Sequence, residues 1–168
     1  MRRFYICKLG CPKNDADADL IAGFLCARGM IEVKTPETAD LLVVNTCGFI
    51  QPAKEESIAA ILDLARIKTA ENGKKLVVTG CLSQRYAKDI KRQMPEVDGV
   101  FGINDFTAIP AVFDNREGQI ISCSGVSATY PEYDFQRIND PEEVFAYIKI
   151  ADGCNNRCSY CAIPDIRG

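Results

Sequence analysis

Short apolar runs rich in β-branched residues alternate along this chain with longer segments in which apolar residues recur every three or four positions. The first pattern is typical of buried strands and the second of amphipathic helices. Glycine or proline lies near the ends of several segments, as expected where helices and strands stop. The pattern predicts strands at 3–9, 40–46, 74–80, 97–102 and 118–123. It predicts helices between them at 15–29, 51–73, 82–94 and 104–115.

Continuously apolar strands separated by helices indicate a parallel sheet that is covered on both faces. We therefore expect a doubly wound, mostly parallel α/β domain over residues 1–122. Residues 123–143 are polar, contain two prolines and have no clear period, which favours a linker or a strap across the domain. In residues 144–168, the stretch VFAYIKI predicts a further strand, and a cysteine-rich loop follows it.

Composition narrows the class of protein. With 168 residues, 47% of them hydrophobic, the chain can form one domain with a substantial core. No apolar run is long enough to span a bilayer, and none near the start is long enough for a secretory signal. A net charge of −3 argues mildly against a surface built to grip nucleic acid. We expect a cytoplasmic protein with no membrane partner.

Cysteine is abundant and histidine is absent: the sequence has nine cysteines and no histidine. The lack of histidine excludes Cys2His2 zinc fingers, histidine acid–base catalysis and Ser-His-Asp triads. In a reducing compartment, thiols serve as metal ligands, catalytic groups or small buried hydrophobes more often than as disulfides. Any metal here must rely on sulfur, and thiolates favour zinc, Cu(I) or iron–sulfur clusters.

Cys11, Cys47 and Cys81 each follow a predicted strand, and they lie 36 and 34 residues apart. That spacing matches one strand–helix–strand unit. Because parallel strands end at one edge of a sheet, the three thiols should lie at the edge where such sheets bind ligands. Each has a glycine beside it, namely Gly10, Gly48 and Gly80. We interpret the set as ligands.

The alternative is that these thiols are buried small hydrophobes, since free cysteine is among the most buried residue types. For the isolated cysteines Cys7, Cys26 and Cys123, we favour that structural role. For three in register beside glycines, we favour a ligand site.

Cys154, Cys158 and Cys161 form a second set with C-x3-C-x2-C spacing. A structural zinc site requires four ligands, whereas only three are present locally. Three thiolates on a four-iron cluster leave one iron open to a further ligand. We favour such a cluster over a zinc knuckle.

The second set, with Tyr160 before its last cysteine, resembles the signature of radical S-adenosylmethionine enzymes. The longer strings GCNNRCSYCAIPDIRG, LGCPKN and NTCGFI resemble the methylthiotransferase family, and most closely its RimO branch. The resemblance implies two 4Fe–4S clusters, one on Cys154, Cys158 and Cys161 and an auxiliary one on Cys11, Cys47 and Cys81. It implies S-adenosylmethionine as cofactor, with Tyr160 near its adenine, and it assigns no catalytic side chain.

The same resemblance implies methylthiolation of an aspartate β-carbon in small-subunit ribosomal protein S12, with electrons from a separate donor. Two alternatives remain open: a tRNA methylthiotransferase of the same family, and a non-catalytic iron–sulfur or zinc scaffold. We expect residues 144–168 to hold only the first strand and cluster loop of a truncated radical-enzyme barrel. The fragment alone should then be inactive, and its terminal stretch poorly ordered.

Four polar residues lie near the cysteines in the sequence. Asn14 and Asn45 are expected either to donate hydrogen bonds to cluster sulfur or to act as a helix N-cap and a turn residue. Lys13 is expected to be a solvated surface charge. Arg167 belongs to the "RG" element that follows the cluster loop in the family.

Overall fold

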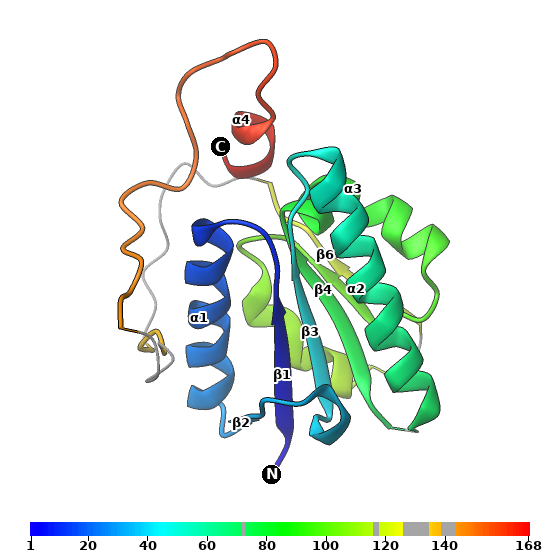
Figure 1. The fold of residues 1–168 in the computed structure, drawn as a ribbon. Coiled ribbons are helices and arrows are strands. Elements are labelled where there is room, and N and C mark those ends of the chain that lie inside the picture. Colours follow the sequence, from blue (N-terminus) through cyan, green and yellow to red (C-terminus); the bar gives the residue numbers. More distant parts are fainter. Residues whose placement is uncertain (72, 116–117, 126–134, 139–143) are drawn as a thin grey trace.

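The structure, a computed structural model, describes residues 1–71, 73–115, 118–125, 135–138 and 144–168. It contains a six-stranded sheet, in the order β2-β1-β3-β4-β5-β6, in which all neighbouring strands are parallel (Figure 1). The strands are β1 (Arg3–Lys8), β2 (Ile31–Glu32), β3 (Leu41–Thr46), β4 (Lys75–Gly80), β5 (Gly99–Phe101) and β6 (Ile120–Ser122). The predicted parallel α/β class is confirmed.

Helices connect the strands where the apolar periodicity predicts them. They are α1 (Pro12–Ala27), α2 (Gln51–Ala70), α3 (Cys81–Gln93) and the short α4 (Ile163–Arg167), with 3₁₀ helices η1 (Pro36–Thr38) and η2 (Phe106–Phe113). Proline at the first helical positions of α1 and α2 costs no hydrogen bond, because those N–H groups have no partner within the helix. Pro110 lies inside η2 and lacks the N–H that an α-helix needs, so the predicted helix at 104–115 forms as 3₁₀.

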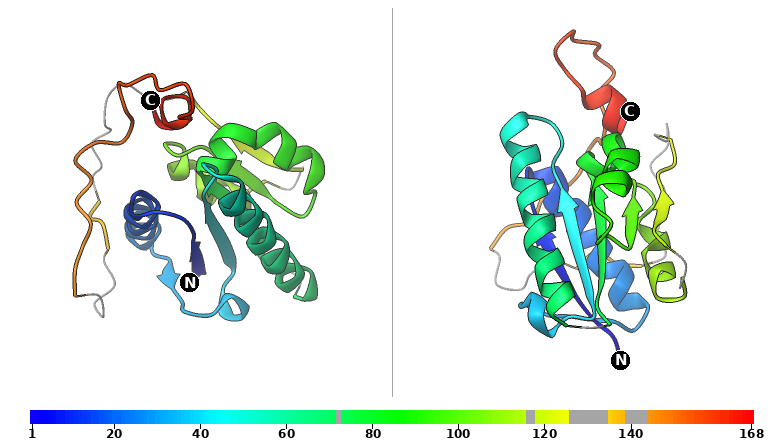
Figure 2. Two further views of the ribbon diagram at one scale, coloured as in Figure 1. Left: turned by 45° about the horizontal axis from the view of Figure 1, so that its top comes forward. Right: turned by 90° about the vertical axis from the view of Figure 1, so that its right-hand side faces the viewer.

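Helices cover both faces of the sheet, as Figure 2 shows for α1 on one side and α2 and α3 on the other. Strand β3 is buried along its whole length. Its side chains alternate between the faces, so that Leu41 and Val43 pack with α1 and η2, whereas Leu42 and Val44 pack with α2 and α3. This two-sided burial explains why the strands have unbroken apolar runs and confirms the doubly wound arrangement.

Two differences from the prediction concern short or unpaired strands. Strand β2 has only two residues, which pair with Arg3 and Phe4 of β1, and a run that short has no sequence pattern. The strand predicted from VFAYIKI is not formed, since residues 144–150 have no strand in the structure. A strand needs a neighbour for its backbone hydrogen bonds, and this segment pairs with none of the described strands.

Part of the predicted linker lies along α1. Phe135 packs edge-to-face on Phe24, with ring centroids 5.3 Å apart, and the Ile138 amide donates to the carbonyl of Asp19 at 3.2 Å. These contacts match the expected strap over positions 135–138, whereas positions 126–134 and 139–143 lie outside the described residues. The boundaries at 122 and 143 stay predictions. In Figure 1 the chain then rises past α1 and ends with α4 above the carboxyl ends of the strands.

None of the helices in the described part of the chain combines the length and the apolar character needed to cross a bilayer.

Candidate cysteine site at the carboxyl edge of the sheet

Cys11, Cys47 and Cys81 lie at the ends of three strands that are adjacent in the sheet, β1, β3 and β4. Cys11 is the N-cap of α1, Cys47 follows β3 directly, and Cys81 is the first residue of α3. Since the strands are parallel, all three cysteines leave the sheet at its carboxyl edge. The structure places the set at one edge as expected, and its role as a ligand set stays a prediction.

Three glycines allow the cysteine loops to approach each other. A β-carbon on Gly10 would lie 2.7 Å from the Cys47 β-carbon. One on Gly48 would lie 3.0 Å from the Cys81 carbonyl carbon, and one on Gly80 would lie 2.5 Å from the Thr46 carbonyl oxygen. Gly10 and Gly80 also have φ values of +97° and +96°, which disfavour residues with a β-carbon. In all three loops the absence of a β-carbon therefore lets neighbouring backbone approach closely.

The three thiols differ in exposure. Cys47 and Cys81 are buried, with 8% and 5% of their surface exposed, whereas Cys11 is exposed. Burial raises the pKa of the Cys81 thiol, Arg167 beside it opposes that rise, and Cys47 adds to it. The Cys47 backbone is fixed by the buried hydroxyl of Ser57 in α2, which accepts from its N–H and donates to its carbonyl, both at 3.0 Å. The site therefore has two enclosed sulfurs and one at its rim.

The roles considered for Asn14 and Asn45 need correction. Asn14 lies inside α1 and Asn45 inside β3, so neither the N-cap nor the turn assignment holds. The Asn14 amide nitrogen donates to the carbonyls of Leu9 and Thr46, at 2.7 and 3.0 Å, and the Asn45 amide nitrogen donates to the Asn14 carbonyl at 2.6 Å. These donors therefore tie the loops together, and it is the oxygen of Asn14, Oδ1, that faces the Cys81 sulfur, at 3.7 Å. Asn45 Oδ1 is buried and has no hydrogen-bond partner in the described structure.

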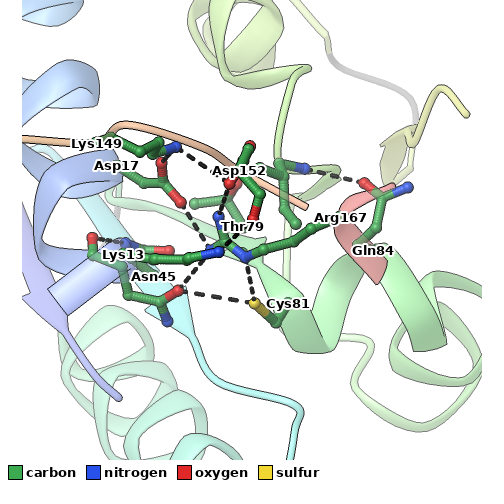
Figure 3. Close-up of polar contacts among 12 residues, drawn as sticks. Lys13, Asp17, Asn45, Thr79, Cys81, Gln84, Lys149, Asp152 and Arg167 are labelled. Atoms are coloured by element: carbon green, nitrogen blue, oxygen red, sulfur yellow. Dashed lines mark hydrogen bonds and ion pairs between the residues drawn. The ribbon is translucent and has the colours of Figure 1, made fainter. Parts of the chain in front are cut away.

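Arg167, at the end of α4, is the residue that joins the chain terminus to this site (Figure 3). Its guanidinium donates from Nε to the Cys81 sulfur at 3.3 Å and from Nη2 to Asn14 Oδ1 at 2.8 Å. It also forms ion pairs with Asp17 at 2.8 Å and with Asp152 at 2.6 Å. The sequence gives no sign of these contacts, because Asp17 is one of three acidic residues, with Asp15 and Asp19, in the first turns of α1, where acidic residues are common.

Two lysines complete this network. Lys149 forms ion pairs with Asp17 and, at 3.4 Å, with Asp152. Lys13 donates to the backbone carbonyl of Asp152, so the expected solvated charge is in fact engaged by the terminal segment. Burial would raise the pKa of Asp152, but Lys149 and Arg167 outweigh burial and hold that pKa below its usual value.

The second set of cysteines lies in a loop that turns back on itself. Cys154 and Cys158 are exposed and Cys161 is half-buried. The Cys154 N–H donates to the Gly168 carbonyl at 2.8 Å, and the Cys161 N–H donates to the Cys158 carbonyl at 3.0 Å. Tyr160 is 86% exposed. The loop thus leaves its thiols and its aromatic ring accessible.

Nowhere in the described ranges do three cysteine, aspartate or glutamate side chains meet in a way that could hold a metal ion. A single zinc ion would require such convergence, with each sulfur about 2.3 Å from the metal. In a four-iron cluster the thiolates bind separate iron atoms, so they need not meet at one point. The Cys11, Cys47 and Cys81 set fits that second case: its loops are lined by glycine backbone, and two of its sulfurs are shielded from water.

The remaining three cysteines lie away from both sets and pack against the two faces of the core: Cys7, Cys26 and Cys123. Burial raises the pKa of each of these thiols. Their environments match the structural role expected for them.

Comparison with known proteins adds two findings. The model of the family described as "Uncharacterized protein family UPF0004" matches residues 3–102. Three similar relatives, from Syntrophomonas wolfei, Carboxydothermus hydrogenoformans and Clostridium acetobutylicum, are each named "Ribosomal protein uS12 methylthiotransferase RimO". They are 47%, 43% and 40% identical over 95%, 99% and 99% of this chain. The chain spans about 37% of the length of these relatives.

Proposed function

The chain belongs to the uncharacterized protein family UPF0004, and on that premise we propose that it serves in a methylthiotransferase that modifies ribosomal protein uS12. Relatives that carry this name match nearly the whole chain at 40–47% identity, which confirms the resemblance drawn from the motifs. We propose the aspartate β-carbon as the modified position. A ribosomal-protein substrate and nine cysteines also fit the reducing environment of the cytoplasm.

The observation that carries the proposal is that the terminal segment with the second cysteine set is anchored, through Arg167, at the sheet edge that bears the first set. Cys11, Cys47 and Cys81 leave three adjacent strands at that edge. The loop with Cys154, Cys158 and Cys161 lies over the same edge, since Arg167 near its end contacts Cys81. A chemistry that needs two neighbouring clusters would require this proximity.

In this proposal the residues have separate tasks. Cys11, Cys47 and Cys81 would hold an auxiliary 4Fe–4S cluster, and Cys154, Cys158 and Cys161 would hold the cluster that binds S-adenosylmethionine, with Tyr160 beside the adenine. When bound, these groups supply the radical chemistry that replaces an unreactive C–H bond with C–SCH3, for which no side-chain base is strong enough. One electron per radical comes from a separate donor.

The chain itself shapes the site of Cys11, Cys47 and Cys81 and shields part of it from water. Burial of Cys47 and Cys81 keeps water from two sulfurs, and Ser57 fixes the backbone that presents Cys47. The glycine loops leave room for a bulky ligand next to the backbone. Cys11 and the exposed thiols of the terminal loop remain open to a substrate from outside.

Anaerobic reconstitution with iron and sulfide tests the ligand sets. The chain should bind about eight iron atoms, and Cys47→Ala and Cys158→Ala should each retain about four. Cys26→Ala serves as the matched control, because Cys26 packs against the core, and should retain about eight. Stoichiometric zinc without visible absorbance in the unsubstituted chain would instead support a zinc scaffold.

The substrate is tested on the full-length enzyme that contains this chain. Mass spectrometry of uS12 peptides should detect a methylthio group on aspartate, and the Cys47→Ala and Cys158→Ala enzymes should form none. The 168-residue chain alone should form no product. Methylthiolated nucleosides in tRNA, with unmodified uS12, would contradict the proposed substrate.

A further inference from the structure

The Arg167 side chain is almost completely enclosed at the carboxyl edge of the sheet, with 1% of its surface exposed. All three of its nitrogens have partners: Nε donates to the Cys81 sulfur, Nη1 to Asp152 Oδ1, and Nη2 to Asn14 Oδ1 and Asp17 Oδ2. Figure 3 shows the guanidinium at the centre of these groups. A buried guanidinium with this many partners is held in one orientation.

The charge beside Cys81 is also permanent. A guanidinium is not deprotonated in proteins, so this side chain keeps its charge at every pH at which the chain is folded. The two carboxylates are shared with Lys149, so the group of four ionised side chains is neutral overall. Within this neutral group the guanidinium is the member that donates to the Cys81 sulfur, so the charge nearest to that sulfur is positive.

We infer that Arg167 is a positioning residue that sets the reduction potential of the cluster held by Cys11, Cys47 and Cys81. The inference rests on the proposed function, because it takes Cys81 to be a cluster ligand. Hydrogen bonds to ligand sulfur and nearby positive charge both favour the reduced, more negative form of a cluster. Arg167 therefore holds the potential higher than the Cys81 environment would otherwise give.

The same residue links this potential to the position of the terminal loop. The carbonyl of Gly168, next to Arg167, accepts from the Cys154 N–H at 2.8 Å, so the guanidinium and the second cysteine set belong to one closed loop. If that loop moved away from the sheet edge, Cys81 would lose its donor. Docking of the loop with the second cysteine set at the sheet edge is therefore coupled to the reduction potential of the cluster on the first set.

The test uses a parent chain with Cys154, Cys158 and Cys161 replaced by alanine, so that only the first set can bind a cluster. After anaerobic reconstitution, iron is counted and the cluster is titrated with dithionite in the presence of mediator dyes. The cluster accepts one electron from dithionite, its core passes from 2+ to 1+, and no covalent bond changes. The variants are Arg167→Gln, Arg167→Lys and the control Arg157→Gln, which removes the same charge from an exposed position of the same loop.

We expect the equilibrium constant for one-electron reduction of the cluster to be at least tenfold lower in R167Q than in the parent. This change corresponds to a shift of about 59 mV to a more negative reduction potential. R167K keeps the charge but cannot reproduce the guanidinium's fork of donors, so its potential should lie between those of the parent and R167Q. R157Q should stay at the parent value. If Arg167 had only a structural role, its replacement would admit water to the cluster. Water stabilises the more highly charged reduced form and so raises the reduction potential. The direction of the shift in potential therefore separates the two roles.

An R167Q potential equal to or above the parent's, with about four iron atoms bound, would overturn the inference and leave the proposed function intact. If R167Q binds no iron, R167K decides: a potential below the parent's supports the inference, and one at or above it overturns it. A parent that takes up no iron overturns both the inference and the proposed function.

Discussion

Gly10 lies so close to Cys47 that a β-carbon added to it would stand 2.7 Å from the Cys47 β-carbon and 3.1 Å from its sulfur. These residues are on neighbouring loops that follow β1 and β3, which are adjacent in the sheet. The loop that carries Cys11 and the loop that carries Cys47 therefore touch only because Gly10 has no side chain.

Replacing Gly10 with alanine should destabilise the fold and impair the first site. The alanine would have φ near +97° and would also collide with Cys47, for a combined loss of about 3 kcal/mol in the free energy of unfolding. Gly29→Ala is the control: its φ is +78° but no atom lies within 4 Å of the added carbon, so it should lose only about 1 kcal/mol. Urea denaturation measures both losses, and equal losses would show that the contact with Cys47 is unimportant.

Ser57 is the basis of a second prediction, because its hydroxyl holds both backbone groups of Cys47. Ser57→Ala leaves a buried N–H and a buried carbonyl without that partner, which should lower the free energy of unfolding by about 2 kcal/mol. Iron uptake by the first set should fall with it. Thr69→Ala removes the hydroxyl of an exposed residue that donates to the Ala65 carbonyl of the same helix, and it should change stability by less than about 0.5 kcal/mol. Iron uptake by S57A equal to that of T69A would contradict the role given to Ser57.

The sheet could be predicted from the sequence because burial on both faces leaves a direct pattern. Strand β3 is apolar at every position from Leu41 to Val44, since successive side chains there enter opposite halves of the core. That apolar run predicts the position of β3 in the sequence. The helices between the strands predict that neighbouring strands are parallel. The position of Cys47 at the sheet edge followed from the same reasoning. A two-residue strand such as β2 is too short to leave any pattern.

The ties around the site could not be predicted, because they join residues far apart in sequence through polar groups. Arg167 lies 86 residues from Cys81 and 150 from Asp17, and charged side chains in a polar loop are ordinarily solvated. The amide roles of Asn14 and Asn45 depend on which carbonyls happen to lie near them once the strands are paired. Local pattern carries no information about such contacts.

The Cys123 thiol should be slow to react and should affect stability only at alkaline pH. Burial, followed by the nearby charge of Asp105, raises its pKa to about 11. A raised thiol pKa favours the folded state below the unfolded pKa of about 8.5, and this contribution is lost as pH rises toward 11. At pH 9, iodoacetamide should label Cys123 more slowly than the exposed Cys11, as peptide mass spectrometry can show. Cys123→Ala should flatten the alkaline loss of stability, and an unchanged loss would contradict this prediction.

Asp19 should hold the strap at residues 135–138 against α1. Its buried carboxylate pairs with Lys8 at 2.8 Å and with Arg137 at 3.0 Å. Asp19→Asn would leave these partly exposed cations facing a neutral group. Because a partly buried pair lies between the exposed and the fully buried case, the free energy of unfolding should fall by about 2 kcal/mol. Trypsin should then cleave after Arg137 faster than in the unsubstituted chain.

The control for this last substitution is Asp63→Asn, which breaks an exposed pair with Arg66. Both partners of that pair are largely in water, so the loss should stay below about 1 kcal/mol and cleavage after Arg137 should not change. Raising the salt concentration should weaken the exposed pair and leave the Asp19 pairs largely intact, since buried charges are poorly screened. Equal cleavage rates after Arg137 in D19N and D63N would mean that the packing of Phe135 on Phe24, rather than the ion pair, holds the strap in place.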